Sequence, residues 1–275
     1  MSREAYESAL DKNPANYTPL SPLSFIERTR DVYPDYKSLV YGSRSYTWRQ
    51  TFDRCVRFAS ALEKSGIVHG DTISVMAANT PELFEAHFGV PMSGAVLSAL
   101  NTRLDADTIA YILDHSDSKI LITDTQFSPV LKKALEILDR DDLTIIDIVD
   151  EQAEFNPGEG ERLGETDYEA FLASGDPEHV WSLPEDEWQA LTLNYTSGTS
   201  GRPKGVVYHH RGSYLMTMGT IPAWGLTPHP KYLSIVPMFH CNGWGHPWTM
   251  TALAGTIVCC RYITAKAIFD AVDEH

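Results

Sequence analysis

The sequence predicts an α/β fold, in which layered sheets of mainly parallel strands are flanked by helices. From residue 47 onward, short apolar segments alternate with segments of helical periodicity. This alternation is typical of parallel strands connected by crossover helices. The chain has 275 residues, of which 43% are hydrophobic and 21% charged. It is therefore able to bury a large core, and disorder, a collagen-like repeat and a coiled coil are excluded as descriptions of the whole chain.

The first predicted elements are a small hairpin and a capped helix. Segments 37–41 and 45–48 flank a turn at Gly42. Thr47 and Gln50 have the spacing of a capping box, which predicts that a helix begins there. Further along, the same reasoning predicts strands over 72–76, 95–100, 119–123 and 143–149, and helices that start near 80 or span 105–115 and 128–138.

Residues 150–187 differ in composition from the segments around them. They are acidic, and Arg162 is the single lysine or arginine from 147 to 187. This composition predicts a solvated excursion with one short helix near 168–173. Beyond it we expect strands over 190–195, 205–208, 231–236 and 256–260, and helices over 213–224, 248–253 and 264–273.

The pattern divides the chain into three parts. These are an N-terminal α/β subdomain (1–150), an acidic excursion (151–187) and the start of a second α/β subdomain (188–275). The chain stops at 273–275 on a predicted helix, whereas the earlier predicted helices are followed by strands. We therefore expect a truncated chain or a fragment.

Charge and cysteine usage narrow the class of partner. The formal net charge is −15, which argues against nucleic acid or an anionic membrane surface and favours a small ligand. No apolar run approaches the ~18 residues of a membrane span, so no integral membrane segment is predicted.

The four cysteines lack a CxxC spacing, which favours a reducing compartment and a cytoplasmic location. We expect no metal site, because no zinc spacing is matched by His209, His210, His240, Cys241 and His246.

The loop from Tyr195 to Gly205 carries the strongest chemical signal. Its sequence is YTSGTSGRPKG, and it follows an apolar strand. Glycines let backbone N–H groups converge on an anion, hydroxyl groups add donors, and Lys204 adds a positive charge. The loop is neither a Walker A motif nor a nucleophile elbow. We predict that a polyphosphate is bound by Thr196, Ser197, Gly198, Thr199, Ser200, Gly201 and Lys204.

This loop resembles the signature loop of the adenylate-forming superfamily, which contains acyl-CoA synthetases, luciferases and nonribosomal adenylation domains. The segment GDTISVMAANTPELFEAHFGVPMSGAVLSALNTRLD and the motif PMFHCNGWGHPW are similar to further motifs of that superfamily. The greatest similarity is to short- and medium-chain acid–CoA ligases, including those that act on 3-methylmercaptopropionate. The resemblance implies the N-terminal part of the adenylate-forming fold.

The resemblance also implies an ATP-dependent acid–CoA ligase reaction. A carboxylate attacks the α-phosphorus of MgATP to give acyl-AMP and pyrophosphate, and the thiol of coenzyme A then displaces AMP. The expected cofactors are ATP, Mg²⁺ and coenzyme A, the expected substrate is a small carboxylic acid, and a homodimer is an expected assembly. By the same resemblance, His240 is a catalytic and substrate-binding residue, and Trp244 forms a wall of the acid pocket. The alternative is that His240 and Trp244 are ordinary core residues.

Several features of the superfamily do not occur in this sequence. The Tyr-Gly-x-Thr-Glu and Thr-Gly-Asp motifs and the C-terminal lid domain with its adenylation lysine are missing. We expect the adenine, ribose and magnesium contacts beyond residue 275, and little activity from this chain alone. A nonribosomal-type adenylation domain and a non-catalytic nucleotide-binding fragment stay open as alternatives. A P-loop NTPase or kinase is disfavoured, because the Gly-Lys-Ser/Thr sequence is lacking.

Overall fold

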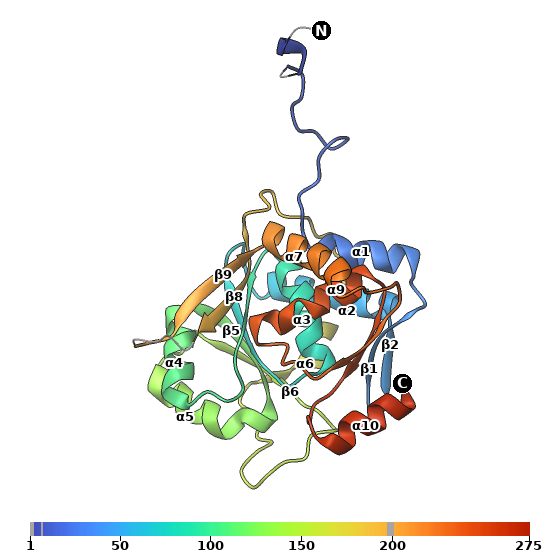
Figure 1. The fold of residues 1–275 in the computed structure, drawn as a ribbon. Coiled ribbons are helices and arrows are strands. Elements are labelled where there is room, and N and C mark those ends of the chain that lie inside the picture. Colours follow the sequence, from blue (N-terminus) through green and yellow to red (C-terminus); the bar gives the residue numbers. More distant parts are fainter. Residues whose placement is uncertain (1–2, 7, 197–200) are drawn as a thin grey trace.

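The computed structural model describes residues 3–6, 8–196 and 201–275 and contains two β-sheets with helices between and around them (Figure 1). The N-terminal segment, with the short 3-10 helix η1 (Arg3–Tyr6), extends away from the sheets. This architecture confirms the predicted α/β fold of layered sheets with mainly parallel strands.

The larger sheet has seven strands in the order β7-β6-β5-β3-β4-β8-β9. All neighbouring strands pair in parallel except β8 and β9, which form an antiparallel hairpin at one edge. The bounds are β3 (Thr72–Met76), β4 (Val96–Ala99), β5 (Ser118–Asp124), β6 (Thr144–Ile148), β7 (Thr166–Asp167), β8 (Ala190–Thr196) and β9 (Lys204–His209).

The smaller sheet has four strands in the order β10-β11-β1-β2. The predicted hairpin is confirmed, because β1 and β2 pair antiparallel, while β11 pairs in parallel with both β1 and β10. Each sheet combines strands from both segments of the chain that were predicted as subdomains, 1–150 and 188–275. The bounds are β1 (Lys37–Tyr41), β2 (Arg44–Thr47), β10 (Lys231–Ser234) and β11 (Thr256–Cys259).

Helices fill the space between the sheets and cover the outer face of the larger one. Every residue of α3 is buried, and in Figure 1 this helix lies between the sheets. The helices α4 and α5 pack on the opposite face of the larger sheet, where they enclose a second apolar core. The bounds are α1 (Leu23–Val32), α2 (Trp48–Lys64), α3 (Pro81–Met92), α4 (Ala106–His115), η2 (Thr125–Phe127), α5 (Ser128–Leu138), α6 (Tyr168–Ala173), α7 (His210–Ala223), α8 (Cys241–Trp244), α9 (His246–Ala252) and α10 (Ala265–Glu274).

Some predicted boundaries are wrong. The helix expected over 213–224 begins at His210, because the His209 side chain accepts a hydrogen bond from Gly212 N (2.9 Å) and caps it. The strand expected over 231–236 ends at Ser234. There the chain leaves the sheet, because the backbone carbonyls of Ser234 and Val236 accept hydrogen bonds from a side chain of another segment instead of a strand.

Candidate functional site

The hairpin of β8 and β9 presents the predicted phosphate loop. Its antiparallel register places Thr196 opposite Lys204, and both residues are exposed at the mouth of the loop. Gly201 has φ of +143°, and a Cβ atom built there meets no other described atom within 4 Å. The backbone conformation, rather than crowding, therefore favours glycine at this position. Ser197, Gly198, Thr199 and Ser200 lie outside the described residues.

A cavity of about 350 Å³ lies where the parallel strands β4 and β8 end. It brings together Thr196 from the loop and His240 from the segment after β10. Ligands of α/β sheets bind at the carboxyl ends of the strands, so the position of this cavity suits a substrate. Its lining also includes Asn101, Asn194, Tyr208, Phe239 and Cys241.

Trp244 lines a neighbouring cavity of about 380 Å³ between β9 and α7. The two cavities are adjacent, because Tyr208 and Cys241 line both of them. The Trp244 side chain is 62% exposed and His240 is also exposed, so neither is a core residue. The structure therefore leaves both side chains accessible to a ligand.

Asn79 holds the chain segment that leads to His240. Its Nδ2 donates hydrogen bonds to Ser234 O (2.7 Å) and Val236 O (2.9 Å), and its Oδ1 accepts one from Met238 N (2.9 Å). Asn79 follows β3 and is buried. Sequence reasoning assigned Asn79 no role, although it lies in the segment that carries the family resemblance.

A further cavity of about 400 Å³ adjoins the first. Phe239 lines both, and the rest of the lining comes from segments that follow β3, β4, β5, β10 and β11. Thr102 and Arg103 contribute from the end of β4. With Asn101, which lines the first cavity, these residues lie at the carboxyl edge of the sheet.

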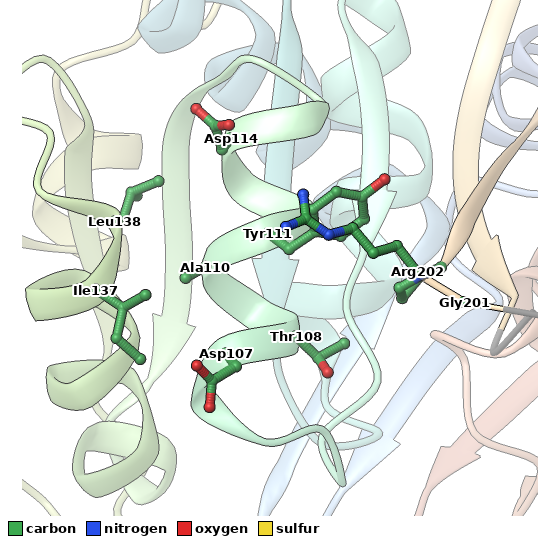
Figure 2. Close-up of a pocket in the computed structure, with 10 residues that line it drawn as sticks. Asp107, Thr108, Ala110, Tyr111, Asp114, Ile137, Leu138, Gly201 and Arg202 are labelled. Carbon is green, nitrogen blue, oxygen red and sulfur yellow. The ribbon is translucent and has the colours of Figure 1, made fainter.

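The C-terminal side of the loop lies against α4. The Arg202 guanidinium lies 5.0 Å from the centre of the Tyr111 ring (Figure 2). Tyr195 is hydrogen-bonded to His115 Nδ1 (2.8 Å), and burial raises the pKa of Tyr195 to about 12. An open cavity of about 690 Å³ beside Arg202 contains Gly201 but no other residue predicted to bind a ligand. We therefore place the candidate site at the cavity of Thr196 and His240.

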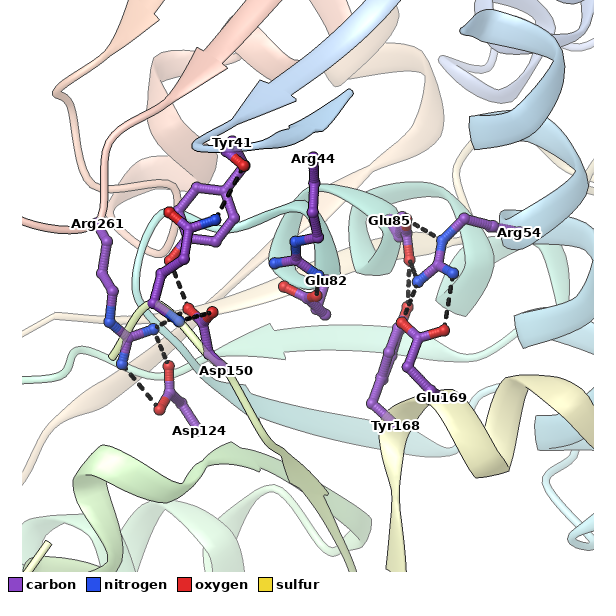
Figure 3. A network of polar contacts seen from close by, with 11 residues as sticks. Tyr41, Arg44, Arg54, Glu82, Glu85, Asp124, Asp150, Tyr168, Glu169 and Arg261 are labelled. Carbon is purple, nitrogen blue, oxygen red and sulfur yellow. Dashed lines mark hydrogen bonds and ion pairs between the residues drawn. The ribbon is translucent and has the colours of Figure 1, made fainter. Parts of the chain in front are cut away.

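Buried charges connect the two sheets near the site (Figure 3). Arg261, which follows β11, forms ion pairs with Asp124 at the end of β5 (2.6 Å) and with Asp150 after β6 (2.8 Å). Tyr41 of β1 donates a hydrogen bond to Asp150. The Arg261 side chain is 3% exposed, so these ion pairs are shielded from water. A similar cluster joins Arg54 of α2 to Glu85 of α3.

Metal and membrane features are not found in the part of the chain that the structure describes. In residues 3–6, 8–196 and 201–275, no group of three or more His, Cys, Asp and Glu side chains is arranged to hold a metal ion. Within the same ranges, no helix is long and apolar enough to cross a membrane. All four cysteines are free thiols.

Residues 26–275 match the AMP-binding enzyme family, and the chain therefore belongs to that family. The chain is 44% identical over 273 residues to a peroxisomal acetate/butyrate–CoA ligase of Arabidopsis thaliana. It is 46% identical over 273 residues to an acetate–CoA ligase of Humulus lupulus. Each match covers 97% of this chain and 48% of the relative, so the chain spans about half the length of these curated relatives.

Solved structures agree on the fold. An anthranilate–CoA ligase in complex with anthranoyl-AMP superposes with a TM-score of 0.81 at 20% identity, over 95% of this chain and 49% of that one. O-succinylbenzoate–CoA synthetase of Bacillus subtilis with AMP gives a TM-score of 0.74 at 22% identity, over 91% and 59% of the two chains. The family match and the CoA-ligase relatives, together with this shared fold, confirm the predicted resemblance to adenylate-forming enzymes.

Proposed function

We propose that this chain supplies the triphosphate loop and part of the acid pocket of an ATP-dependent acid–CoA ligase. The parent protein is here a chain of the relatives' length that contains residues 1–275. In the first step, a carboxylate oxygen of the acid bonds to the α-phosphorus of MgATP, and pyrophosphate leaves. In the second, the sulfur of coenzyme A bonds to the acyl carbon, and AMP leaves with the carboxylate oxygen.

The observation that supports this proposal is the placement of Thr196 in one cavity with His240. Negative charge grows on the leaving pyrophosphate during attack at the α-phosphorus, so donors and cations around the β- and γ-phosphates stabilise the transition state. The Thr196 hydroxyl and the Lys204 ammonium group suit this task, and the two residues are paired in the β8–β9 register. His240 is exposed at the same cavity, where it is able to meet the carboxylate or the α-phosphate.

The loop residues Ser197, Gly198, Thr199, Ser200 and Gly201 complete the proposed phosphate-binding set. Magnesium enters as MgATP, and we expect its protein ligands, the adenine and ribose contacts and the adenylation lysine in the remainder of the parent protein. The relative from Bacillus subtilis has been solved with ATP and a magnesium ion.

We propose that coenzyme A approaches through the cavity that Arg103 lines. This cavity and the cavity of Thr196 and His240 share Phe239 in their linings, so the two are adjacent. Arg103 is exposed and offers a cation to a phosphorylated cofactor. A nonribosomal-type adenylation domain would pass its acyl group to a carrier domain instead. The acetate and acetate/butyrate relatives are both named CoA ligases, which favours coenzyme A.

Acid-dependent exchange of labelled pyrophosphate into ATP tests the proposed function. The first step alone is sufficient for exchange, so coenzyme A is not required. We expect exchange with a short acid in the parent protein and little or none with residues 1–275 alone, because the remaining contacts are needed. A parent protein that shows no exchange with any acid contradicts the proposal. Exchange by residues 1–275 at the parent's rate shows that the catalytic groups are misplaced.

Trp244 is proposed to limit the length of the acid. We expect linear acids with about three to eight heavy atoms beyond the carboxylate, including thioethers, because an apolar pocket discriminates by ~1–3 kcal/mol for each methylene group. Replacing Trp244 with alanine opens the cavity of about 380 Å³ at one wall, so Trp244→Ala should shift the optimum towards longer acids. A panel of acids assayed with parent and variant measures this shift. Identical profiles would remove Trp244 from the acid pocket.

Location and assembly are further proposals. Four free thiols support the cytoplasmic location predicted from the sequence, whereas the name of the Arabidopsis relative makes the peroxisome the alternative. Imaging of the tagged parent protein separates the two locations.

We also propose a homodimer, and light scattering of the parent protein measures its mass.

A further inference from the structure

The turn over residues 241–245 has a backbone conformation that is rare for residues with side chains. All five residues have positive φ: Cys241 (44°), Asn242 (43°), Gly243 (57°), Trp244 (55°) and Gly245 (71°). Gly243 N donates to His240 O (2.9 Å), and Gly245 N donates to Asn242 O (3.0 Å), which closes a left-handed turn. Such a conformation costs about 1–2 kcal/mol for most residues and less for asparagine. The turn therefore needs support from its surroundings.

Asn242 connects this turn to β8. Its side chain is completely buried, and its Oδ1 accepts hydrogen bonds from Thr192 Oγ1 and from Asn194 Nδ2, each 2.7 Å long. Side chains at every second position of a strand point to the same face. Thr192 and Asn194 therefore share a face of β8 with Thr196, where the phosphate loop begins. The strand that leads into the loop thus also holds the left-handed turn.

The position of Asn242 gives this connection a consequence for the acid. His240 lies two residues before it and Trp244 two residues after it, and these residues line the two adjacent cavities. A displacement of the turn would move both side chains relative to the loop. We propose that Asn242 is a positioning residue, which holds His240 and Trp244 in register with the phosphate loop so that the carboxylate meets the α-phosphorus. This inference rests on the proposed function.

Two substitutions at Asn242 separate the backbone from the side chain. Asn242→Gly keeps access to the left-handed conformation and removes the buried side chain with its hydrogen bonds, whereas Asn242→Ala removes the hydrogen bonds and also makes the left-handed conformation unfavourable. In pyrophosphate exchange by the parent protein, we expect Asn242→Gly to raise the KM for the acid about tenfold or more. The KM for ATP should change less than about threefold, because the hairpin is retained. Asn242→Ala should have a larger effect.

A double-mutant cycle tests whether the hydrogen bonds to β8 carry the effect. Thr192→Val removes one donor while keeping the shape of the side chain, so it should raise the KM for the acid less than Asn242→Gly does. The double variant should show little more than the effect of Asn242→Gly, because both changes remove the same contact. Full multiplication of the two effects would contradict the coupling.

A matched control removes a buried hydrogen bond elsewhere. Ser38→Ala deletes the contact between Ser38 and Thr51 (2.6 Å), and should lower the Tm without changing the KM for the acid or for ATP. An unchanged KM for the acid in Asn242→Gly, or an equal rise in both KM values, overturns the inference and leaves the proposed function standing. If the unaltered parent protein shows no acid-dependent exchange, the proposed function fails and the inference fails with it.

Discussion

Replacing Arg261 with methionine is expected to destabilise residues 1–275 by about 3–5 kcal/mol, the usual cost of breaking a buried ion pair from one side. Arg261 pairs with two buried carboxylates, Asp124 and Asp150, and also donates to Gln126 Oε1 (2.7 Å). Methionine fills part of the volume but leaves both carboxylates without their cation. Urea unfolding of wild type and Arg261→Met measures the difference.

The loss of stability in Arg261→Met should depend on pH in a defined direction. Burial raises the pKa of Asp124, and the Arg261 guanidinium opposes that rise. Without the guanidinium, the folded state takes up protons at a higher pH than the unfolded state does. A group whose folded-state pKa is raised contributes more stability as the pH falls. The destabilisation of Arg261→Met should therefore be smaller at pH 5 than at pH 8.

Arg140 provides a matched control for Arg261. It forms an ion pair with Asp142 (2.8 Å), whose side chain is 58% exposed. Removal of Arg140 leaves an exposed carboxylate without its cation, not a buried one, so Arg140→Met should cost much less than Arg261→Met. Equal losses of unfolding free energy in the two variants would contradict the stabilising role given to the buried ion pairs of Arg261.

Replacing Lys204 with alanine is expected to lower the rate of pyrophosphate exchange by the parent protein about tenfold or more. A charge-assisted contact contributes ~1.5–3 kcal/mol, and each 1.4 kcal/mol corresponds to roughly a factor of ten in rate. Lys204 is exposed, so the fold should be unaffected. Gly201→Val should reduce the rate further, because φ of +143° is unfavourable for a β-branched residue.

A lysine outside the site provides the comparison for Lys204. Lys266 on α10 is 85% exposed and pairs with Asp270, so Lys266→Ala should leave the exchange rate unchanged. The rate is measured together with the Tm of each variant. An unchanged rate for Lys204→Ala, with an unchanged Tm, would remove Lys204 from the phosphate-binding set.

The sequence predicted the elements whose signals are local. The capping box of Thr47 and Gln50 is present in the structure, and the predicted strand over 72–76 and helix over 128–138 have the observed bounds. Helix α1 was missed, because it follows Pro22 and has no side-chain cap. The antiparallel direction of β9 was also missed, since apolar periodicity does not report strand direction.

The candidate site was predictable only in part, because only some of its signals are local in the sequence. Glycines, hydroxyl groups and a lysine in one short loop predict an anion-binding function. The motif around His240 also lies in one segment, so it too was visible in the sequence. Asn79 and Asn242 were not predicted, because their contacts join residues that are distant along the chain. Asn79 reaches Met238 across 159 positions, and Asn242 reaches Thr192 across 50. Only the fold brings these partners together.

The proposed function requires that a carboxylate bound at this site attacks the α-phosphorus of ATP. The most direct test gives the parent protein ATP, coenzyme A and a short acid, such as butyrate, with both carboxylate oxygens labelled with ¹⁸O. The labelled oxygen that bonds to phosphorus leaves with AMP when the thiol attacks the acyl carbon. We expect AMP that carries one ¹⁸O atom. Unlabelled AMP, or ADP formed together with ¹⁸O-labelled phosphate, would contradict the proposed function.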